Sequence, residues 1–521
     1  MTFAPTLSAT ANAGSYIILA VYLCLIVSIA VFSHKKSSSL NSFYLSNRGM
    51  SGWMSAFAYG TTYFSAVVFI GYAGKLGMFM GLATIWIGIT NAIIGSLFAW
   101  LVLAKRTRAM SNALEARTMP EFFEKRYESK YLKLYGSLVI FVFLIPYCTS
   151  VYQGLGYLIE AAYGLDFVWC VIIMAVVTAA YLFVGGYFAE ALSAFIQGII
   201  MIIGVFVMLI FMLNSSNVNW GEGLSKLTEM GYGVFPTFQS GTGKLIDSAG
   251  FNLIILCLLT SFGIWSLPQS IHKFYTIKDN AAIKRGTLIS TVFALIIGGG
   301  AYLNGGLSRL FFDNPAAIAP DRVVPTMFQQ VGMPAVLLSF IAVLVLSASM
   351  STLSSLSLSS ASTVSIDFYR GYIRRTASDS NVKVLMRVLC IVFILVSALI
   401  AIAEVDAIVT LMSLSWGTIA GCFIGPYIYG LYSKKVNKAG VYASITFSLV
   451  LTLTLILVFG FTETPKGTDF GDVLKQGIGR SPLIGVLAMA SSMVITPIVS
   501  LFTKKYNPGK KTLELCYPKK A

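Results

Sequence analysis

The sequence has little charge for its length. Only 11% of its 521 residues are Asp, Glu, Lys or Arg, whereas 56% are hydrophobic and the mean hydropathy is +0.79. A soluble globular protein of this length cannot bury so much apolar surface. The composition therefore excludes a soluble fold and predicts an all-α protein that crosses a membrane many times.

Enzyme signatures are missing as well. The chain has only two histidines, His34 and His272, and it contains no HExxH, GxSxG or phosphate-binding-loop motif. Its seven cysteines show no CxxC or paired spacing, so packing is their expected role. We therefore expect that the protein is not an enzyme.

What the sequence does contain is a series of long apolar runs. A membrane-spanning helix needs about 20 mostly apolar residues. Thirteen runs meet this requirement, at residues 15–33, 53–73, 80–103, 135–160, 167–183, 189–213, 250–271, 288–308, 334–366, 386–403, 406–431, 440–461 and 482–502. They leave no room for a separate soluble domain, so we predict a single membrane transport domain over residues 1–521.

The net charge of +16 comes from basic residues that gather on one side of the membrane. With the N-terminus outside, most of the 37 Lys and Arg fall in cytoplasmic loops, including the clusters at 34–36, 104–110, 124–133, 370–375, 433–438 and in the C-terminal tail. This positive-inside bias predicts a cell-membrane protein with an external N-terminus and a cytoplasmic C-terminus. The expected partner is the lipid bilayer and not a nucleic acid. The first run follows a neutral segment without a basic region, so we expect a retained helix and no cleaved signal peptide.

Two of the runs contain residues that interrupt a helix. The run at 53–73 and the segment after it carry Gly60, Gly71 and Gly74, with Thr61, Thr62 and Ser65 among them, and the run at 250–271 carries Gly263 and Pro268. Interrupted helices release backbone groups, which membrane proteins tolerate only beside protein or a water-filled cavity. These two runs lie five helices apart. Matching breaks in two five-helix halves are typical of secondary transporters built from an inverted repeat.

A run of hydroxyls, "SASMSTLSSLSLSSAS" at 347–362, lies inside the predicted helix 334–366. Side chains on a helix lean toward its N-terminus, which places the oxygens of Ser351 and Thr352 beside the carbonyl of Ala348. Two interpretations stay open. The hydroxyls serve packing, by bonding back to their own helix or by allowing close helix contact. Alternatively, they join two carbonyls freed at the first break and form a five-oxygen cage suited to sodium.

Several motifs, in order along the chain, resemble those of the sodium:solute symporter family, which includes bacterial proline/sodium, sialic acid/sodium and galactose/sodium symporters. They are "SASMSTLSS", "TMPEFFEKRY" (118–127), "GGYFAEALSAFIQG" (185–198), "LPQSIHKF" (267–274) and "GPYIYGLYSKKVNKAG" (425–440). The resemblance implies a leucine-transporter-like fold with broken first and sixth core helices. It divides the chain into an extra N-terminal helix (15–33), a first repeat (53–213), a second repeat (250–431), two peripheral helices (440–502) and a tail (503–521).

The same resemblance implies the ion sites. The coupling ion, Na⁺, would be held by the carbonyls of Thr61, Phe64 and Ala348 and by the hydroxyls of Ser351 and Thr352. A second sodium site in the family joins an Asp to hydroxyls that match Ser354 and Ser355. Ala194 stands in place of that Asp, so the support for a second site is weak. Two interpretations of Glu190, one turn earlier on the same face, stay open: a substitute ligand, or a residue at the cytoplasmic interface, where a charge costs little.

The motifs say less about the identity of the solute than about the ion sites. Sugar-binding members use polar residues where this chain has Val68 and Gly88, whereas Tyr147 matches a pocket tyrosine of the proline/sodium members. We assign the solute site to Ser65, Val68, Tyr147, Gln153, Trp265 and Gln269. Lys75 could attract an anion or could simply be a solvated interfacial lysine.

These matches favour a monomeric sodium-coupled symporter that imports an amino acid or an organic or sugar acid by alternating access. The alternatives are a sugar or polyol symporter, and a sensor or channel on the same scaffold.

Overall fold

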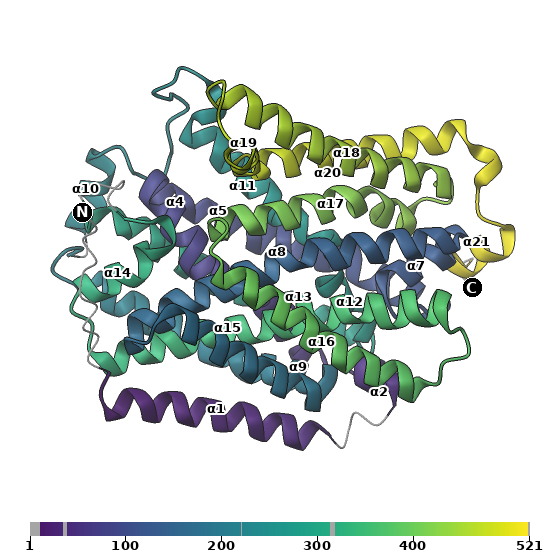
Figure 1. The fold of residues 1–521 in the computed structure, drawn as a ribbon, viewed down its shortest axis with the longest axis horizontal. Coiled ribbons are helices and arrows are strands. Elements are labelled where there is room, and N and C mark those ends of the chain that lie inside the picture. The colour runs from purple at the N-terminus through teal and green to yellow at the C-terminus, as the bar shows by residue number, and fades with distance from the viewer. Residues whose placement is uncertain (1–10, 35–38, 220, 313–317, 519–521) are drawn as a thin grey trace.

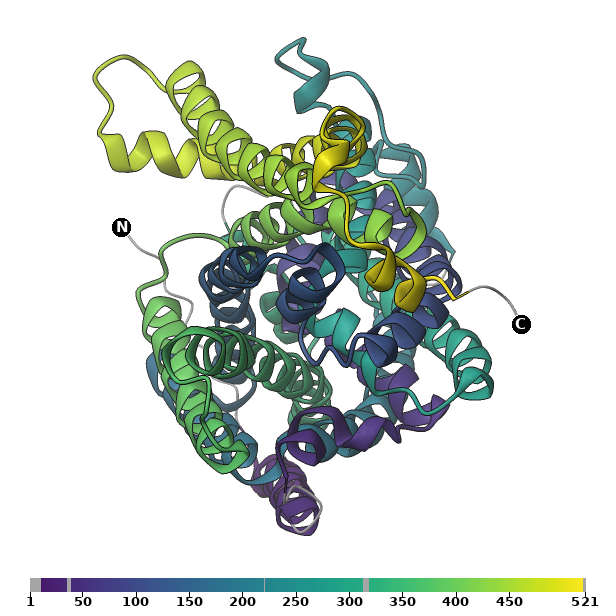
Figure 2. The ribbon, with the colours of Figure 1, turned by 90° about the vertical axis from the view of Figure 1, so that its right-hand side faces the viewer.

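Helices make up nearly all of the structure, a computed structural model that describes residues 11–34, 39–219, 221–312 and 318–518. The β structure in these ranges is one isolated bridge, between Met50 and Ile277. The long helices lie side by side along the longest axis of the molecule (Figures 1 and 2). The predicted all-α class is thereby confirmed. Lys35 and Lys36 of the first basic cluster, the first ten residues and the last three lie outside the described residues.

The element bounds are as follows. The long helices are α1 (Ala13–His34), α8 (Lys130–Tyr163), α9 (Phe167–Leu213), α13 (Asn280–Leu307), α15 (Ala335–Ser362), α16 (Asp379–Ile402), α17 (Ile408–Tyr432), α18 (Lys438–Glu463) and α20 (Ser481–Phe502). The shorter helices are α2 (Leu40–Leu45), α3 (Gly52–Tyr63), α4 (Ala73–Met80), α5 (Ile85–Thr90), α6 (Lys105–Ala113), α7 (Met119–Tyr127), α10 (Glu222–Glu229), α11 (Ala249–Gly263), α12 (Pro268–Thr276), α14 (Val323–Gln330), α19 (Phe470–Gly479) and α21 (Lys510–Cys516). Wider π-helical stretches occupy Val67–Tyr72, Asn91–Phe98, Trp100–Ala104 and Thr363–Ile373.

Eleven helices in the described residues are long and apolar enough to cross a membrane, two fewer than the thirteen predicted. The predicted span 53–73 is broken at Phe64, so α3 is too short, and the second half continues with the next span as the stretch Val67–Ala113. The predicted span 167–183 remains as a shorter apolar helix, because α9 is kinked at Gly186, where φ is +60°. The two differences therefore have local causes in the backbone.

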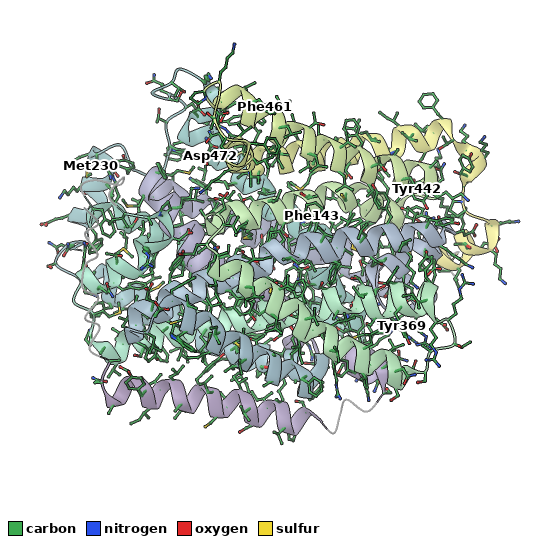
Figure 3. The ribbon with its side chains drawn as sticks, in the orientation of Figure 1. Phe143, Met230, Tyr369, Tyr442, Phe461 and Asp472 are labelled. Carbon is green, nitrogen blue, oxygen red and sulfur yellow. The ribbon has the colours of Figure 1, made fainter. Side chains whose placement is uncertain are left out.

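The helices divide into a buried core and a lipid-facing rim. The stretch Ala335–Ile373, which begins with α15, is called the α15 stretch. In the most apolar part of each helix, 94% of the residues of α17 and 83% of those of the α15 stretch are buried, against 28% for α1 and for α18. Figure 1 shows α1 along one edge of the bundle and α18 with α20 along the opposite edge. Large apolar side chains such as Phe461 project from the rim (Figure 3). Since lipid is as apolar as these side chains, an exposed apolar rim is the expected surface of a membrane protein.

The first broken helix is interrupted between Tyr63 and Val67. Phe64 is extended (φ −108°, ψ 108°), and the Ala66 N–H donates to the Ser349 hydroxyl of α15 at 3.2 Å. The break was expected near glycines, but Gly60 has another role: a Cβ there would lie 2.4 Å from the Phe293 ring. The glycine allows close packing against α13, while the break itself is stabilised from α15.

The second broken helix is interrupted where the sequence predicts it. α11 ends at Gly263, a short 3₁₀ turn follows, Leu267 is extended (φ −73°, ψ 126°), and α12 begins at Pro268. Proline has no N–H to bond the preceding turn and disfavours a helical residue before it, whereas it suits the first position of a helix. Both broken helices are thus present, and their breaks lie next to the core helices α15 and α17.

Candidate functional site

The end of α3 and the middle of α15 meet at a cluster of oxygen atoms. The Thr61 hydroxyl lies 2.7 Å from the Ser351 hydroxyl. The Thr352 hydroxyl lies 3.2 Å from the carbonyl oxygen of Thr61 and 3.1 Å from that of Ala348. All four residues are buried. The structure thus brings together four of the five residues that the sequence assigns to sodium.

The Thr352 hydroxyl faces more acceptors than it can satisfy. It has one O–H, yet three carbonyl oxygens lie within 3.4 Å, those of Thr61, Ala348 and Thr62. Phe64, the fifth predicted ligand, is the extended residue at the break, and its carbonyl accepts no hydrogen bond from the described part of the chain. Neutral oxygens in excess at a dry position are the ligands that a hard cation prefers.

The hydroxyl run of α15 has two uses. Ser349 and Ser354 bond back to the carbonyl four residues earlier, at 2.7 Å each, which is the usual role of hydroxyls in membrane helices. Ser351, Thr352 and Ser355 contact the neighbouring helices α3 and α9, and Thr352 also bonds back to the Ala348 carbonyl at 3.1 Å. The packing interpretation therefore holds for Ser349 and Ser354, and the sodium interpretation of Ser351 and Thr352 stays a prediction.

Three aromatic rings gather beside this oxygen cluster. Trp416 of α17 contacts the Tyr147 ring edge-to-face at 5.7 Å and stacks on Tyr63 at 5.9 Å. The Tyr147 hydroxyl donates to the Thr62 carbonyl at 3.5 Å. A Cβ at Gly263 would meet the Trp416 ring at 3.3 Å, so this ring also lies against the second break. The rings therefore lie between the two interrupted helices.

Trp416 carries an unused donor. Its indole Nε1–H is buried and makes no hydrogen bond of good geometry with the described residues, although the Tyr147 hydroxyl lies near it. Buried polar groups are nearly always satisfied, so such a group needs an explanation. Neither Trp416 nor Tyr63 was predicted from the sequence. The signal was available in "SLSWGT" and "GTTYFS", where a large aromatic residue interrupts a run of small polar ones.

Trp265 does not join these rings. Its Nε1–H donates to the Ile94 carbonyl at 3.0 Å and its ring packs on Phe262 at 5.4 Å. Its donor is therefore satisfied by the scaffold. Thr260 is likewise engaged, bonding Asn91 at 2.8 Å.

The remaining predicted solute residues are all buried. The Ser65 hydroxyl accepts from the Val67 N–H at 3.3 Å, within the first break, and Val68 follows it. Gln153 donates to the Asp406 carbonyl at 3.3 Å. The side-chain oxygens of Gln153 and Gln269 have no donor within the residues described. These two amides leave acceptors that a ligand could use.

Ser355 leads to a buried ion pair. It donates to the Glu190 carboxylate at 2.6 Å, and the Lys273 ammonium lies 2.6 Å from the same oxygen and 2.9 Å from the Ser355 hydroxyl. Glu190 is therefore buried and paired with a lysine, and its carboxylate is not exposed to solvent. Ala194 is fully buried, and the Ser354 hydroxyl is bonded to its own helix.

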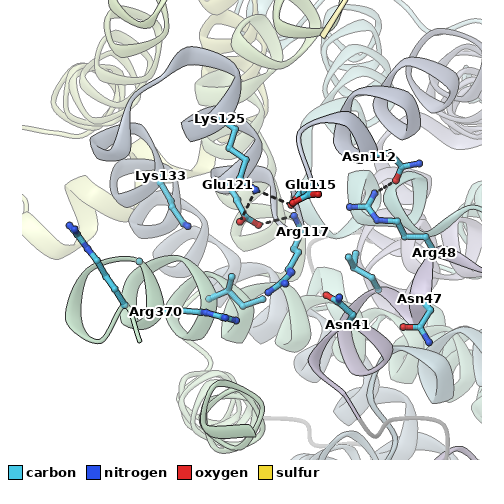
Figure 4. A pocket seen from close by; sticks show the side chains of 14 residues that line it. Asn41, Asn47, Arg48, Asn112, Glu115, Arg117, Glu121, Lys125, Lys133 and Arg370 are labelled. Carbon is cyan, nitrogen blue, oxygen red and sulfur yellow. Dashed lines mark hydrogen bonds and ion pairs between the residues drawn. The ribbon is translucent and has the colours of Figure 1, made fainter. Parts of the chain in front are cut away.

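Two cavities lie toward opposite ends of the bundle. One, of about 310 Å³, is lined by Lys75, Asp247, Asn252 and Thr410, beside α4 and the start of α17. The other, of about 690 Å³, lies between α2, α6, α7 and the end of the α15 stretch (Figure 4). Six of its lining residues are basic and two are acidic: Arg48, Arg117, Lys125, Lys133, Arg370 and Arg375, with Glu115 and Glu121.

Glu121 is held between basic groups in the larger cavity, as Figure 4 shows. Burial opposes its ionisation, but the ammonium groups of Lys125 and Lys133 outweigh burial and keep the pKa of Glu121 below its ordinary value. The carboxylate accepts from the Arg117 backbone N–H at 2.8 Å. This end of the molecule is therefore strongly basic.

Comparison with known proteins places the chain among transporters. The family model described as "Sodium:solute symporter family" matches residues 43–447. The chain is 27% identical over 507 residues to the osmoregulated proline transporter of Bacillus subtilis, covering 95% of this chain and 96% of the relative. It is 28% identical over 475 residues to the sodium/pantothenate symporter of Haemophilus influenzae, covering 88% and 95%.

A solved structure shows the same fold. A Na⁺-coupled sialic acid symporter, in a substrate-bound outward-open state, superposes with a TM-score of 0.74 at 16% identity, covering 94% of this chain and 98% of that chain. The leucine-transporter-like arrangement expected from the sequence is confirmed by this likeness.

Proposed function

The chain belongs to the sodium:solute symporter family and is a sodium-coupled symporter of a small organic solute, and we propose that this solute is an amino acid or a related small organic acid. The observation that carries the proposal is the oxygen cluster between the broken α3 and α15, with aromatic rings beside it. Under this proposal, the ion site and the solute site share one short stretch of backbone, Thr61–Phe64.

We assign the coupling sodium to the carbonyls of Thr61, Phe64 and Ala348 and the hydroxyls of Ser351 and Thr352. The contacts between Thr61 and Ser351 and around Thr352 support this assignment, because they collect neutral oxygens from two helices. Neutral ligands hold sodium without a fixed carboxylate, so the ion can leave again on the inner side. Sodium would hold the broken end of α3 against α15, which stabilises one arrangement of the two helices.

We assign the solute to the space around Tyr63, Tyr147 and Trp416. The unused Trp416 N–H suits a carboxylate oxygen of the solute, and the free side-chain oxygens of Gln153 and Gln269 suit an ammonium or imino group. Proline and pantothenate, named in the two relatives, and sialic acid, named in the solved structure, all carry a carboxylate. Because Tyr147 contacts the Thr62 carbonyl, bound sodium would order the backbone that faces the solute.

A sugar or polyol is less well supported. Sugar-binding relatives need a polar side chain at position 88, but a Cβ on Gly88 would lie 2.7 Å from the Gly298 backbone of α13. That position is used for close packing between helices and has no room for a side chain.

We further propose that the protein works as a monomer in the cell membrane with its N-terminus outside. Solute would enter near the smaller cavity beside Lys75 and leave near the basic cavity. The repeats at 53–213 and 250–431 would rearrange around the central sites in alternating access.

The test is uptake into proteoliposomes. An imposed inward sodium gradient should drive accumulation of a zwitterionic amino acid or a small carboxylate above its external concentration, and a potassium gradient should not. A thermal-shift screen over amino acids, organic acids and sugars, with and without sodium, would supply the solute. Equilibration without accumulation would indicate a channel, and saturable sodium-dependent stabilisation by hexoses alone would contradict the proposed solute class.

A further inference from the structure

A lysine ammonium lies buried beside the proposed ion site. The Lys273 Nζ of α12 is 2.6 Å from the Glu190 carboxylate of α9 and 2.9 Å from the Ser355 hydroxyl of α15. The exposed fractions of the two charged side chains are 1% and 0%. The Tyr187 ring covers the ammonium, with its centroid 5.0 Å away. Each charge of the pair therefore depends on the other for compensation.

Among the described residues, the side chains in contact with the pair carry no third charge. Tyr187 comes from α9, His272 is the neighbour of Lys273 on α12, and Ser355 and Thr62 face the pair from α15 and α3. The second carboxylate oxygen of Glu190 has no partner in the described ranges of the chain. A buried carboxylate without a cation is strongly unfavourable. Removing the ammonium alone would thus leave a negative site that must take up a cation or a proton.

The ammonium contacts oxygens of the kind that an alkali cation would use. They are one Glu190 carboxylate oxygen and the Ser355 hydroxyl, and the Thr62 hydroxyl lies 3.0 Å from that of Ser355. One carboxylate with neutral hydroxyls is a hard-oxygen set of the kind that small alkali and alkaline-earth cations prefer. Ser355 is also one of the two hydroxyls that the family resemblance links to a second sodium.

We propose that the Lys273 ammonium is a tethered cation that fills an intramembrane sodium site, so that the protein takes up one mobile sodium ion instead of two. This inference rests on the proposed function for the first ion site. The two sites touch: Thr62 bonds Ser355 through its hydroxyl, while its carbonyl lies 3.4 Å from the Thr352 hydroxyl. The ammonium is therefore linked to the first ion site through Ser355 and Thr62. It stays in place when the sodium ion dissociates.

The experiment removes the ammonium and counts ions. Purified protein without solute is titrated with radiolabelled Na⁺, and bound ions per protein and the Hill coefficient are measured. Wild type should bind one ion with a Hill coefficient of about 1, and Lys273→Met should bind two with a coefficient approaching 2. The double variant Lys273→Met/Glu190→Gln, which removes both charges, should return to one. Ser339→Ala, a buried hydroxyl of α15 that donates to the Ala335 carbonyl at 2.8 Å, is the matched control and should match wild type.

The outcomes separate this inference from the proposed function. A wild type that binds no sodium contradicts the proposed function. The inference is overturned, and the proposed function is kept, if wild type and Lys273→Met each bind one ion. The same holds if ion binding by Lys273→Met depends on pH and not on sodium. If Lys273→Met is unstable in choline, the melting temperature of this variant is compared in sodium and in choline. Rescue by sodium, absent in the double variant, supports the tethered cation, and failure of sodium to rescue it contradicts the proposal.

Discussion

The hydroxyls of Thr61 and Ser351 lie 2.7 Å apart although 290 positions separate them in the chain. Thr61 also donates to the Phe57 carbonyl, at 2.8 Å. Its oxygen is thus fixed by its own helix and presented to α15. With both hydroxyls fixed in place, a cation at this junction would be bound without much loss of side-chain freedom.

Substituting the hydroxyls of the cluster should weaken sodium binding. Ser351→Ala or Thr352→Ala should each raise the sodium concentration for half-maximal uptake about tenfold, corresponding to roughly 1.4 kcal/mol for a lost ligand. The measurement is solute uptake over a range of sodium concentrations. Ser339→Ala, on the same helix and bonded to the Ala335 carbonyl, should leave the value unchanged. Unaltered sodium dependence in the double alanine variant would exclude this site.

Substitution of the two buried tryptophans near the breaks should have different effects on solute affinity and on stability. Trp416→Phe removes an unused donor, so solute affinity should fall about tenfold if that N–H binds a solute carboxylate, a loss of roughly 1.4 kcal/mol. Trp265→Phe removes a donor already bonded to Ile94, so it should lower the melting temperature with little change in solute affinity. Isothermal titration with the identified solute and a thermal melt separate the two effects. Equal affinities in Trp416→Phe and wild type would remove Trp416 from the pocket.

The sequence predicted what depends on local chemistry. The break before Pro268 follows from the missing N–H of proline, and the apolar runs follow from hydropathy alone. The pairing of Ser351 and Thr352 with the first break was also predictable, because helix geometry and the family resemblance indicate the same oxygens.

Apart from that junction, the sequence did not predict which side chains of distant helices meet. That Trp416 points at Tyr147 while Trp265 points at Ile94 depends on the rotation of α17 and of the turn after α11. The pairing of Glu190 with Lys273 needs α9 and α12 side by side, and the spacing of 83 residues gives no sign of it. The glycine clusters were expected to break helices, yet several of them allow close helix packing, which a sequence pattern does not distinguish.

Close packing between α4 and α13 gives a matched pair of variants. A Cβ at Gly305 would lie 2.2 Å from the Ala73 carbonyl oxygen, whereas a Cβ at Gly299, on the same helix, meets nothing within 4 Å among the described residues. Gly305→Ala should therefore separate the helices and lower both melting temperature and uptake. Gly299→Ala should be neutral or stabilise by a few tenths of a kcal/mol up to about 1 kcal/mol, since alanine favours helix. A Gly305→Ala protein as stable as Gly299→Ala would contradict this packing.

Asp321 should make stability depend on pH. Burial raises the pKa of its carboxyl from 3.8 to about 6, although the Ile408 N–H donates to it at 3.0 Å. Because the folded state binds this proton more tightly than the unfolded chain, its contribution is present at low pH and is lost as the pH rises from about 4 through about 6. The loss amounts to at most about 3 kcal/mol.

Asp321→Asn keeps an acceptor for Ile408 and cannot ionise, so it should be the more stable protein at pH 7 and should lose this part of the pH dependence. Melting temperatures measured between pH 4 and pH 7 provide the check. Asp469→Asn, an exposed cap that accepts from the Gly471 N–H at 2.8 Å, is the control and should leave the profile unchanged. Parallel profiles for wild type and Asp321→Asn would show that Asp321 does not titrate in this range.

The coupling ratio should be one sodium per solute. Ala194 offers no carboxylate, and the acid one turn away, Glu190, is already paired with the Lys273 ammonium. A potential of 100 mV contributes about 2.3 kcal/mol and a tenfold sodium gradient about 1.4 kcal/mol, so one ion supplies roughly 3.7 kcal/mol for a zwitterionic solute. That free energy sustains an accumulation of roughly 500-fold, and a second ion would double the free energy.

The ratio can be measured as a reversal potential in proteoliposomes, with the solute and sodium gradients fixed and the voltage varied until net flux stops. The expected voltage is the one at which a single sodium ion balances the solute gradient. Ala194→Asp places a second carboxylate one turn from Glu190, and since one ammonium cannot neutralise both acids, the variant should recruit another cation. Its ratio should therefore rise toward two, or the protein should stall with sodium bound, which radiolabelled sodium retained after dilution would reveal. A wild-type ratio of two would contradict both this coupling ratio and the tethered cation at Lys273.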